Sequence, residues 1–146
     1  RAQTALGVMY EAGEGVPQDD AEAVQWYRLA AEQGNAYAQF NLGILLNEGR
    51  PGLLRDDAEA VRWFRLAAEQ GDADAQAELG RMYMEGFGVP QDEMAAHMWL
   101  NISVANGNES AVSALETVAR KMISSDVSKA VKRARTCMES NYTDCD

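Results

Sequence analysis

Two short motifs return at regular intervals along the 146-residue chain, and this repetition restricts the possible folds more than any other feature. The first motif reads AQTALG, AQFNLG and AQAELG at residues 2–7, 38–43 and 75–80, so its copies begin 36 and then 37 residues apart. The second motif reads AVQWY, AVRWF and AHMWL at residues 23–27, 60–64 and 96–100. A fixed period of this length is the signature of a repeat protein, in which each unit buries its apolar face against the next.

Both halves of each repeat have the periodicity of helices. Leu42 and Leu46 share one face in the first half, and Ala60, Phe64 and Ala67 recur at helical spacing in the second half. Aspartates precede each second half and glycines follow it, as expected for helix starts and stops. The sequence predicts eight helices, near residues 1–12, 19–33, 35–48, 56–70, 72–85, 92–106, 109–122 and 126–140, with N-caps at Asp19, Asp56 and Asp92 and left-handed ends at Gly34, Gly71 and Gly107.

Three glycines occupy the middle of the first helices, where each costs about 1 kcal/mol relative to alanine. They are Gly7, Gly43 and Gly80. Their common register indicates a packing reason, namely a close approach of the two helices of each unit. We expect the tryptophan of the second helix to fill the space beside each glycine.

A fourth, degenerate unit closes the chain. Ala111 keeps the register of the first motif, but Glu116 replaces its glycine, and Arg133 stands at the tryptophan position. Asp126 matches the N-cap Asp92 after a two-residue deletion. A polar terminal unit keeps a repeat stack from adding further copies. We therefore expect one domain over residues 1–146, with units near 1–34, 35–71 and 72–107 and a capping unit over 108–146.

These motifs resemble the Sel1-like repeat, a relative of the tetratricopeptide repeat. The resemblance implies an all-α fold, a right-handed superhelical α/α solenoid of antiparallel helix pairs. It also implies an adaptor or scaffold function. The second unit departs from the pattern at Gly49–Leu54, which is one residue longer, and the third departs at Leu100. The first unit carries nearly the whole pattern at Ala2, Gln3, Leu6, Gly7, Tyr10, Gly13, Gly15, Val16, Asp19, Ala23, Trp26, Tyr27, Ala30, Ala31, Gln33 and Gly34.

The charge of the chain is strongly acidic and unevenly spread. The formal net charge is -10, with 7 basic and 19 acidic residues (-12) over residues 1–119 and 6 basic and 4 acidic residues (+2) over 120–146. This balance argues against nucleic acid and anionic membrane surfaces as partners and favours basic or neutral proteins. No apolar run has the roughly 18 residues of a membrane span. Because Arg1 already lies inside a repeat, we expect the chain to be a fragment of a longer protein. We also expect it to be a monomer.

Signals for chemistry are weak. The glycine-rich segments 13–16 and 86–89 lack the strand and third glycine of a dinucleotide site, and the acidic pair Asp19–Asp20 lacks EF-hand spacing. His97, the single histidine, is expected to pack in the core. Some cysteine-rich members of the resembled family are linked to β-lactam chemistry, but the chain has no Ser-x-x-Lys or Lys-Thr-Gly. We therefore expect no catalytic residue, metal or cofactor. A hydrolase and a structural spacer in a longer chain stay open as alternatives to a protein-binding adaptor.

The first helix of each pair lines the inner groove in tetratricopeptide-type stacks, and this resemblance supplies a candidate binding surface. An apolar strip bordered by carboxylates and amides suits a peptide or protein segment with basic flanks. Packing of Phe40 and Ile44 against the adjacent repeat is the alternative. The partner-binding candidates are Val8, Glu11, Tyr37, Phe40, Asn41, Ile44, Asn47, Glu48, Asp74, Glu78, Arg81, Met84 and Glu85.

The two cysteines are expected to form a disulfide. Aligning Ala130 with Ala60 places Cys137 and Cys145 at alanine positions that flank the turn between helices, where two backbones approach closely. Asn141 falls at the glycine position and can reverse the chain in the left-handed conformation. Cysteine-rich members of the resembled family carry pairs with the same seven intervening residues. The bonded pair implies a periplasmic or secreted protein, and two free thiols in the cytoplasm are the alternative.

Overall fold

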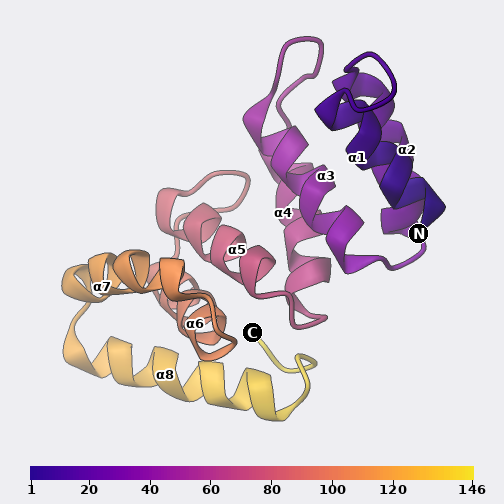
Figure 1. The fold of residues 1–146 in the computed structure, drawn as a ribbon. Coiled ribbons are helices and arrows are strands. Elements are labelled where there is room, and N and C mark those ends of the chain that lie inside the picture. Colours follow the sequence, from indigo (N-terminus) through magenta and orange to yellow (C-terminus); the bar gives the residue numbers. More distant parts are fainter. The chain divides into compact units, whose positions relative to one another are not determined.

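The computed structural model describes residues 1–146 as helices joined by turns, with no strand (Figure 1). The residues form two compact units, each larger than a single repeat. They are named the first unit (Arg1–Ala67) and the second unit (Ala68–Asp146). This architecture confirms the predicted all-α class. No helix is both long enough and apolar enough to cross a membrane. The helices are α1 (Ala2–Ala12), α2 (Asp20–Glu32), α3 (Ala36–Glu48), α4 (Asp57–Ala68), α5 (Ala73–Glu85), α6 (Glu93–Ala105), the 3-10 helix η1 (Glu109–Ala111), α7 (Val112–Lys121) and α8 (Ser124–Glu139).

Capping side chains begin the second helices of all three repeats, as predicted. The carboxylate of Asp19 accepts from the backbone N–H of Glu22 at 3.1 Å, and Asp56 and Asp92 repeat this bond at 3.0 Å each. Such a bond satisfies one of the free N–H groups in the first turn of the helix. At the opposite ends, the predicted left-handed glycines have φ values of 91°, 91° and 95°. They are Gly34, Gly71 and Gly107.

The mid-helix glycines mark close helix contacts, but the tryptophan prediction is wrong. A Cβ atom added at Gly7 would lie 2.6 Å from the ring of Tyr27, and one at Gly43 would lie 2.6 Å from Phe64. At Gly80 the nearest atom belongs to Leu100, at 2.8 Å. In every repeat the residue after the tryptophan therefore fills the space. It points into the helix pair because successive helical side chains are 100° apart, which leaves the tryptophan at the side.

A buried glutamine in the first motif ties α3 and α5 to the turns that precede them. The Nε2 atom of Gln39 donates to the carbonyl of Ala31 at 3.1 Å, and Gln76 makes the same bond to Ala68 at 3.0 Å. Both glutamine side chains are buried. These carbonyls, in the last turns of α2 and α4, also accept from the backbone N–H groups of Gly34 and Gly71 at 3.0 Å each, so the glutamine adds a second bond to the same acceptor. The repeat thus carries its own polar link between consecutive helices.

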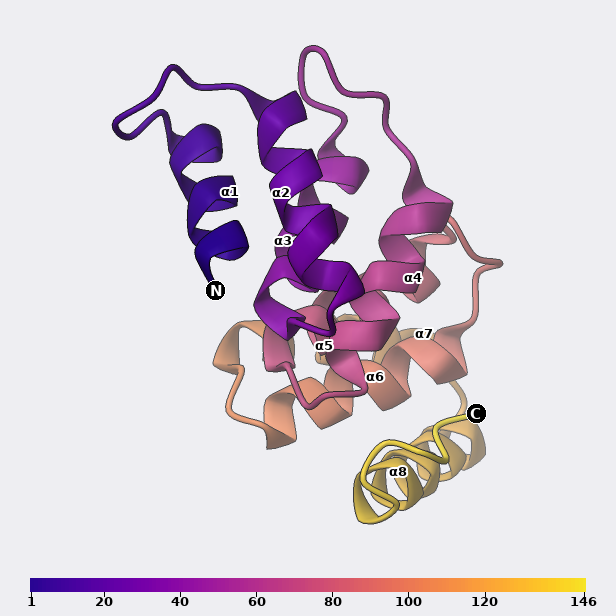
Figure 2. The same ribbon diagram turned by 90° about the vertical axis from the view of Figure 1, so that its right-hand side faces the viewer.

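In the first unit, α1 packs against α2, and α2 packs against α3 (Figures 1 and 2). Members of the second motif and two leucines of α3 are among the fully buried side chains. They include Ala23, Tyr27, Leu42, Leu45 and Phe64. The apolar positions that the sequence pattern assigns to the core are therefore buried, which leaves the remaining positions of the first helices to solvent.

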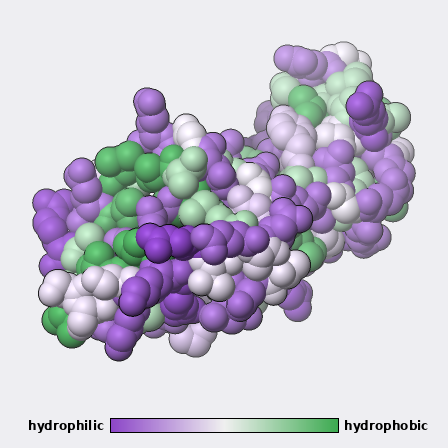
Figure 3. All heavy atoms as spheres, turned by 90° about the horizontal axis from the view of Figure 1, so that it is seen from below, coloured by the Kyte–Doolittle hydropathy of each residue, from purple (hydrophilic) through white to green (hydrophobic).

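In the second unit, α6 is enclosed by its neighbours. It packs against α5, α7 and α8, and Trp99 and Leu100 on it are both 1% exposed. Seen from below, apolar side chains gather toward the end of this unit at which α7 leads into α8 (Figure 3). The register match of Asp126 to Asp92 does not extend to capping, because α8 begins at Ser124 and Ile123 occupies its N-cap position without a side-chain bond. Asp126 lies within the first turn instead.

A disulfide joins Cys137, at the end of α8, to Cys145, as predicted. The Cα atoms are 4.4 Å apart, and the intervening chain reverses through Asn141 at a φ of 55° and Tyr142 at 66°. The hydroxyl of Tyr142 accepts from Nδ2 of Asn106 at 2.9 Å, and its ring lies over Gly71. The closed loop therefore docks onto the turns that end the second and third repeats.

Candidate functional site

A hollow of about 330 Å³ opens in the first unit beside the first helices. Three of the predicted partner-binding residues line it, namely Val8 and Glu11 from α1 and Tyr37 from α3. Tyr37 is 55% exposed, so its ring is available to a partner. The other lining residues are Ala12, Tyr27 and Arg50.

Glu11 is the polar centre of this hollow. Its Oε2 atom accepts from the hydroxyl of Tyr27 at 2.7 Å, and its Oε1 atom pairs with the guanidinium of Arg50 at 3.2 Å. Burial raises the pKa of Tyr27 well above its usual range, and the hydrogen bond to Glu11 and the negative charge of Glu11 raise it further. Tyr27 is therefore a neutral donor that fixes the Glu11 carboxylate at the wall of the hollow.

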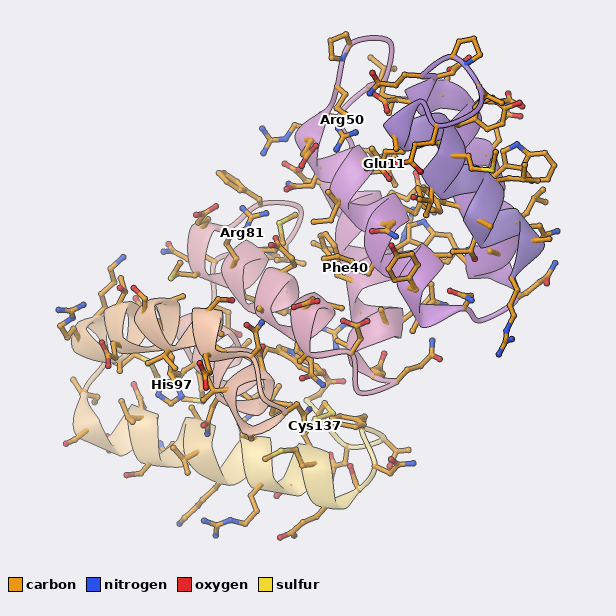
Figure 4. All side chains as sticks on the ribbon, in the orientation of Figure 1. Glu11, Phe40, Arg50, Arg81, His97 and Cys137 are labelled. Atoms are coloured by element: carbon orange, nitrogen blue, oxygen red, sulfur yellow. A yellow bond between two sulfur atoms is a disulfide. The ribbon has the colours of Figure 1, made fainter.

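Arg50 gathers carboxylates from three helices of the first unit. It pairs with Glu48 at 2.7 Å and with Asp20 at 3.4 Å, in addition to Glu11 (Figure 4). The hydrogen bond to Glu48 raises the pKa of the guanidinium, and the charges of the three carboxylates act in the same direction. One positive charge thus faces three negative ones, which leaves the site with an excess of negative charge.

The other predicted residues of the first unit remain at least partly exposed. The ring of Phe40 meets Phe64 of the same repeat at a centroid distance of 6.0 Å. Asn47 donates from Nδ2 to the carboxylate of Asp57 at 2.9 Å, and Asn41 and Ile44 are partly exposed on α3. The structure thus gives Phe40 a packing partner inside its own repeat while leaving part of the ring accessible.

The predicted residues of the second unit form a charged surface on α5. The guanidinium of Arg81 pairs with Glu78 at 2.9 Å and with Glu85 at 3.1 Å, one turn away on either side. Met84 is partly buried against the cluster that contains Leu100, and Asp74 is exposed at the start of the helix. These residues all lie on α5.

Sequence reasoning missed Tyr27 and Arg50. Tyr27 belongs to the repeated core pattern, and nothing in that pattern indicates that its hydroxyl reaches Glu11. Arg50 lies in the longer loop Gly49–Leu54, which the sequence marks as a departure from the repeat. The insertion was the available signal, but the direction in which a loop folds depends on contacts that the pattern does not contain.

His97 lies inside the second unit rather than in a site. Its side chain is 4% exposed, its Nδ1 atom has no hydrogen-bond partner, and burial lowers its pKa (Figure 4). No group of three or more His, Cys, Asp or Glu side chains in the described residues is placed to hold a metal ion.

The described geometry agrees with a family of helix-pair repeats. The Sel1 repeat model matches residues 1–35, 36–72 and 73–108. The chain belongs to the Sel1 repeat family. Sel1 repeats are generally protein-interaction modules, and their members and structural neighbours are typically non-enzymatic scaffolds. The resemblance inferred from the sequence is therefore confirmed.

The solved structures similar to this Sel1 chain include a bacterial antigen and a second Sel1 repeat protein. A protective antigen present in uropathogenic Escherichia coli strains, which displays an SLR fold, is 47% identical over 75% of the chain with a TM-score of 0.73. A Sel1 repeat protein from Oxalobacter formigenes is 38% identical over 78% of the chain with a TM-score of 0.74. The chain spans 23% and 46% of the lengths of these two proteins.

Proposed function

We propose that this Sel1 chain is an adaptor that binds a protein or peptide partner through exposed positions of its first helices. The general role of the family supports the proposal. The observation that carries it is the hollow beside α1 and α3, where Val8, Glu11 and Tyr37 meet. An exposed tyrosine beside a fixed carboxylate offers both apolar contact and a charged hydrogen bond, which are typical of interaction sites. The remaining exposed positions of α3, and those of α5, extend the proposed surface within their own units.

The proposed partner segment carries an apolar side chain next to a lysine or arginine. Glu11, Asp20 and Glu48 bring three negative charges to the hollow, and Arg50 supplies one positive charge. A basic partner side chain would share these carboxylates with Arg50, whereas an acidic one would be repelled. The net charge of -10 acts in the same direction at longer range.

The proposed setting is an oxidising compartment, either the periplasm or the outside of the cell. The Cys137–Cys145 disulfide supports this location, because reducing compartments keep such pairs as thiols. We propose a monomeric form, because α8 presents a polar outer face with exposed residues such as Lys129, Lys132 and Arg135. A polar terminal face disfavours stacking of one repeat protein on another.

The experiment compares Tyr37→Ala with Leu54→Ala, a matched loss of an exposed apolar side chain on a loop of the same unit. A partner captured by cross-linking to the wild-type chain is purified, and its affinity for each variant is measured by calorimetry. We expect Tyr37→Ala to weaken binding by about 30-fold, the effect of removing an interface hot spot. Leu54→Ala should bind normally. Equal binding by all three proteins, with unchanged circular dichroism, would place the partner site elsewhere.

A further inference from the structure

The second unit contains a different hollow, of about 520 Å³, that shares no residue with the proposed partner site. It lies where the loop before α6 meets the two-residue turn between α7 and α8. One wall is formed by Pro90–Met94, and the other by Lys121–Ile123 together with Asp126. All of these residues belong to one compact unit.

Ile123 is the anomalous residue in this hollow. It occupies the N-cap position of α8, where its side chain forms no hydrogen bond and is 67% exposed. At the same position, the second helices of the repeats carry aspartate, which caps them. An isoleucine here gives up the side-chain cap and exposes 67% of its surface to water, so it contributes less to the helix than a capping residue and less to the core than a buried one. Residues that break a local rule in this way are expected where a function requires them.

The surroundings of Ile123 extend its apolar surface. Met94 and Met122, which line the same hollow, are only partly buried, and Pro90 is exposed. Apolar side chains gather toward this end of the unit in the view from below (Figure 3). Methionine side chains are flexible and adapt to partners of different shape. The hollow therefore has adaptable apolar side chains on both walls.

Acidic side chains from both walls also line the hollow. Asp92, Glu93 and Asp126 line it, and Lys121 is the single basic residue among the lining side chains. The Asp92 carboxylate caps α6 by accepting from the N–H of Ala95 at 3.0 Å. No ion pair joins Lys121 to Glu93 or Asp126 in the structure. Three carboxylates against one ammonium group make this hollow complementary to a positive charge.

We propose that this hollow is a second docking site, for a partner segment in which a large apolar side chain stands beside a lysine or arginine. The apolar side chain would pack on Ile123 and the two methionines, and the basic one would meet Glu93 and Asp126. Phosphate groups of a nucleic acid or a lipid would face the same carboxylates, so the charge disfavours them. The proposal stands apart from the adaptor site of the first unit, because each can fail without the other.

The test uses Ile123→Ser, because serine restores a cap to α8 while removing the apolar side chain. The probe is a fluorescein-labelled peptide with lysine–leucine–lysine at the centre of a glycine–serine frame. Two matched peptides carry glutamate–leucine–glutamate and lysine–serine–lysine at the centre. Binding is measured by fluorescence polarisation, and the site is located by amide chemical shifts. Leu54→Ser, a change of an exposed leucine in the first unit, is the control.

We expect the lysine–leucine–lysine peptide alone to shift the amides of residues 91–94 and 121–126. Ile123→Ser should weaken its binding by roughly 10-fold or more, while the melting temperature rises by about 4 °C because α8 gains a cap. Leu54→Ser should bind the peptide like the wild type. In the double variant Glu93→Gln/Asp126→Asn, the preference for lysine over glutamate flanks should disappear.

Four results would overturn the proposal. The first is unchanged peptide binding by Ile123→Ser. The second is equal binding of the peptides with lysine and glutamate flanks to the wild type. The third is a fall in the melting temperature of Ile123→Ser, which would show that Ile123 serves the fold. The fourth is a concentration-dependent shift of the same amides without peptide, which would assign the hollow to a second copy of the chain.

Discussion

The helices α2 and α6 are the second helices of the first and third repeats, yet matching positions in them have opposite surroundings. Leu29 of α2 is 44% exposed, whereas Ile102, 73 residues later at the matching position of α6, is 0% exposed. Gln25 is exposed, and its counterpart Met98 is buried. The difference comes from α8, which packs against α6 and covers the face that α2 leaves to solvent.

This comparison separates two kinds of information in the repeat. The motif sets the backbone and the inner face of each helix pair, which explains why Tyr27 and Leu100 occupy matching places over their glycines. The residues on the outer face depend on whether a later helix covers that face, as α8 covers α6. Burying Gln25 under a helix without a hydrogen-bond partner would be costly, and the third repeat has the apolar Met98 at that position. The composition of the outer face thus differs between a helix that another helix covers and one that solvent covers.

The largest expected effect tests this division directly. Ile102→Ala should lower the free energy of unfolding by about 2–5 kcal/mol, because it removes a fully buried side chain and leaves a cavity under α8. Leu29→Ala, the matched change on α2, should cost less than about 1 kcal/mol, because much of that side chain already contacts water. Urea denaturation of both variants measures the difference. Equal losses would mean that the outer faces of α2 and α6 are equally important to stability, which contradicts the comparison.

The second prediction concerns a variant that loosens α8, the helix that covers α6. Cys137→Ser/Cys145→Ser should lower the free energy of unfolding by about 2–3 kcal/mol, as the chain-entropy model gives for a short closed loop. The loop would then release Tyr142 from Asn106, and the end of α8 would fray. Hydrogen exchange should speed up at the end of α8 and along the face of α6 that α8 covers, while α2 stays unchanged.

A mass measurement provides the control for this prediction. Alkylation of the folded wild-type chain without reductant should add no alkyl group, and two groups should be added after reduction. Two groups on the folded, unreduced chain would contradict both the disulfide and the oxidising compartment proposed from it. A double variant as stable as the wild type would instead show that the disulfide is unnecessary for holding α8 in place.

Much of the fold could be predicted because the sequence pattern of each helix of the pair occurs in three successive repeats. The caps at Asp19, Asp56 and Asp92 and the disulfide follow from register and appear in the structure. The tryptophan prediction failed by one residue, since helical periodicity alone cannot decide whether the tryptophan or the large apolar residue after it points at the glycine. The match of Asp126 to Asp92 did not extend to capping because α8 belongs to the degenerate fourth repeat, where no second copy fixes the register.

The candidate site was less predictable than the fold. Val8, Glu11 and Tyr37 lie at one hollow because they occupy non-core positions of neighbouring first helices, and the repeat supplies those positions. Arg50 completes the hollow from an inserted loop. Its side chain is held there by ion pairs with Glu11, Asp20 and Glu48, which lie on three different helices. Such convergence of separate elements has no periodic signal in the sequence, so only the folded structure reveals it.

The smallest expected effect compares His97 of α6 with Val24, its counterpart on α2. Burial lowers the pKa of His97 below its ordinary 6.5, so the unfolded chain takes up a proton that the folded chain refuses. Stability from the neutral histidine is therefore complete above about pH 6.5 and is lost as the pH falls below that value, by at most about 1.4 kcal/mol per pH unit. His97→Val should remove this part of the pH dependence, because valine does not titrate. Urea denaturation of both proteins between pH 7.5 and roughly pH 5 isolates the histidine, since the carboxylates titrate alike in the two chains. Parallel stability curves would show that His97 is protonated as easily in the folded chain as in the unfolded one, and that α6 is less tightly covered than the comparison with α2 requires.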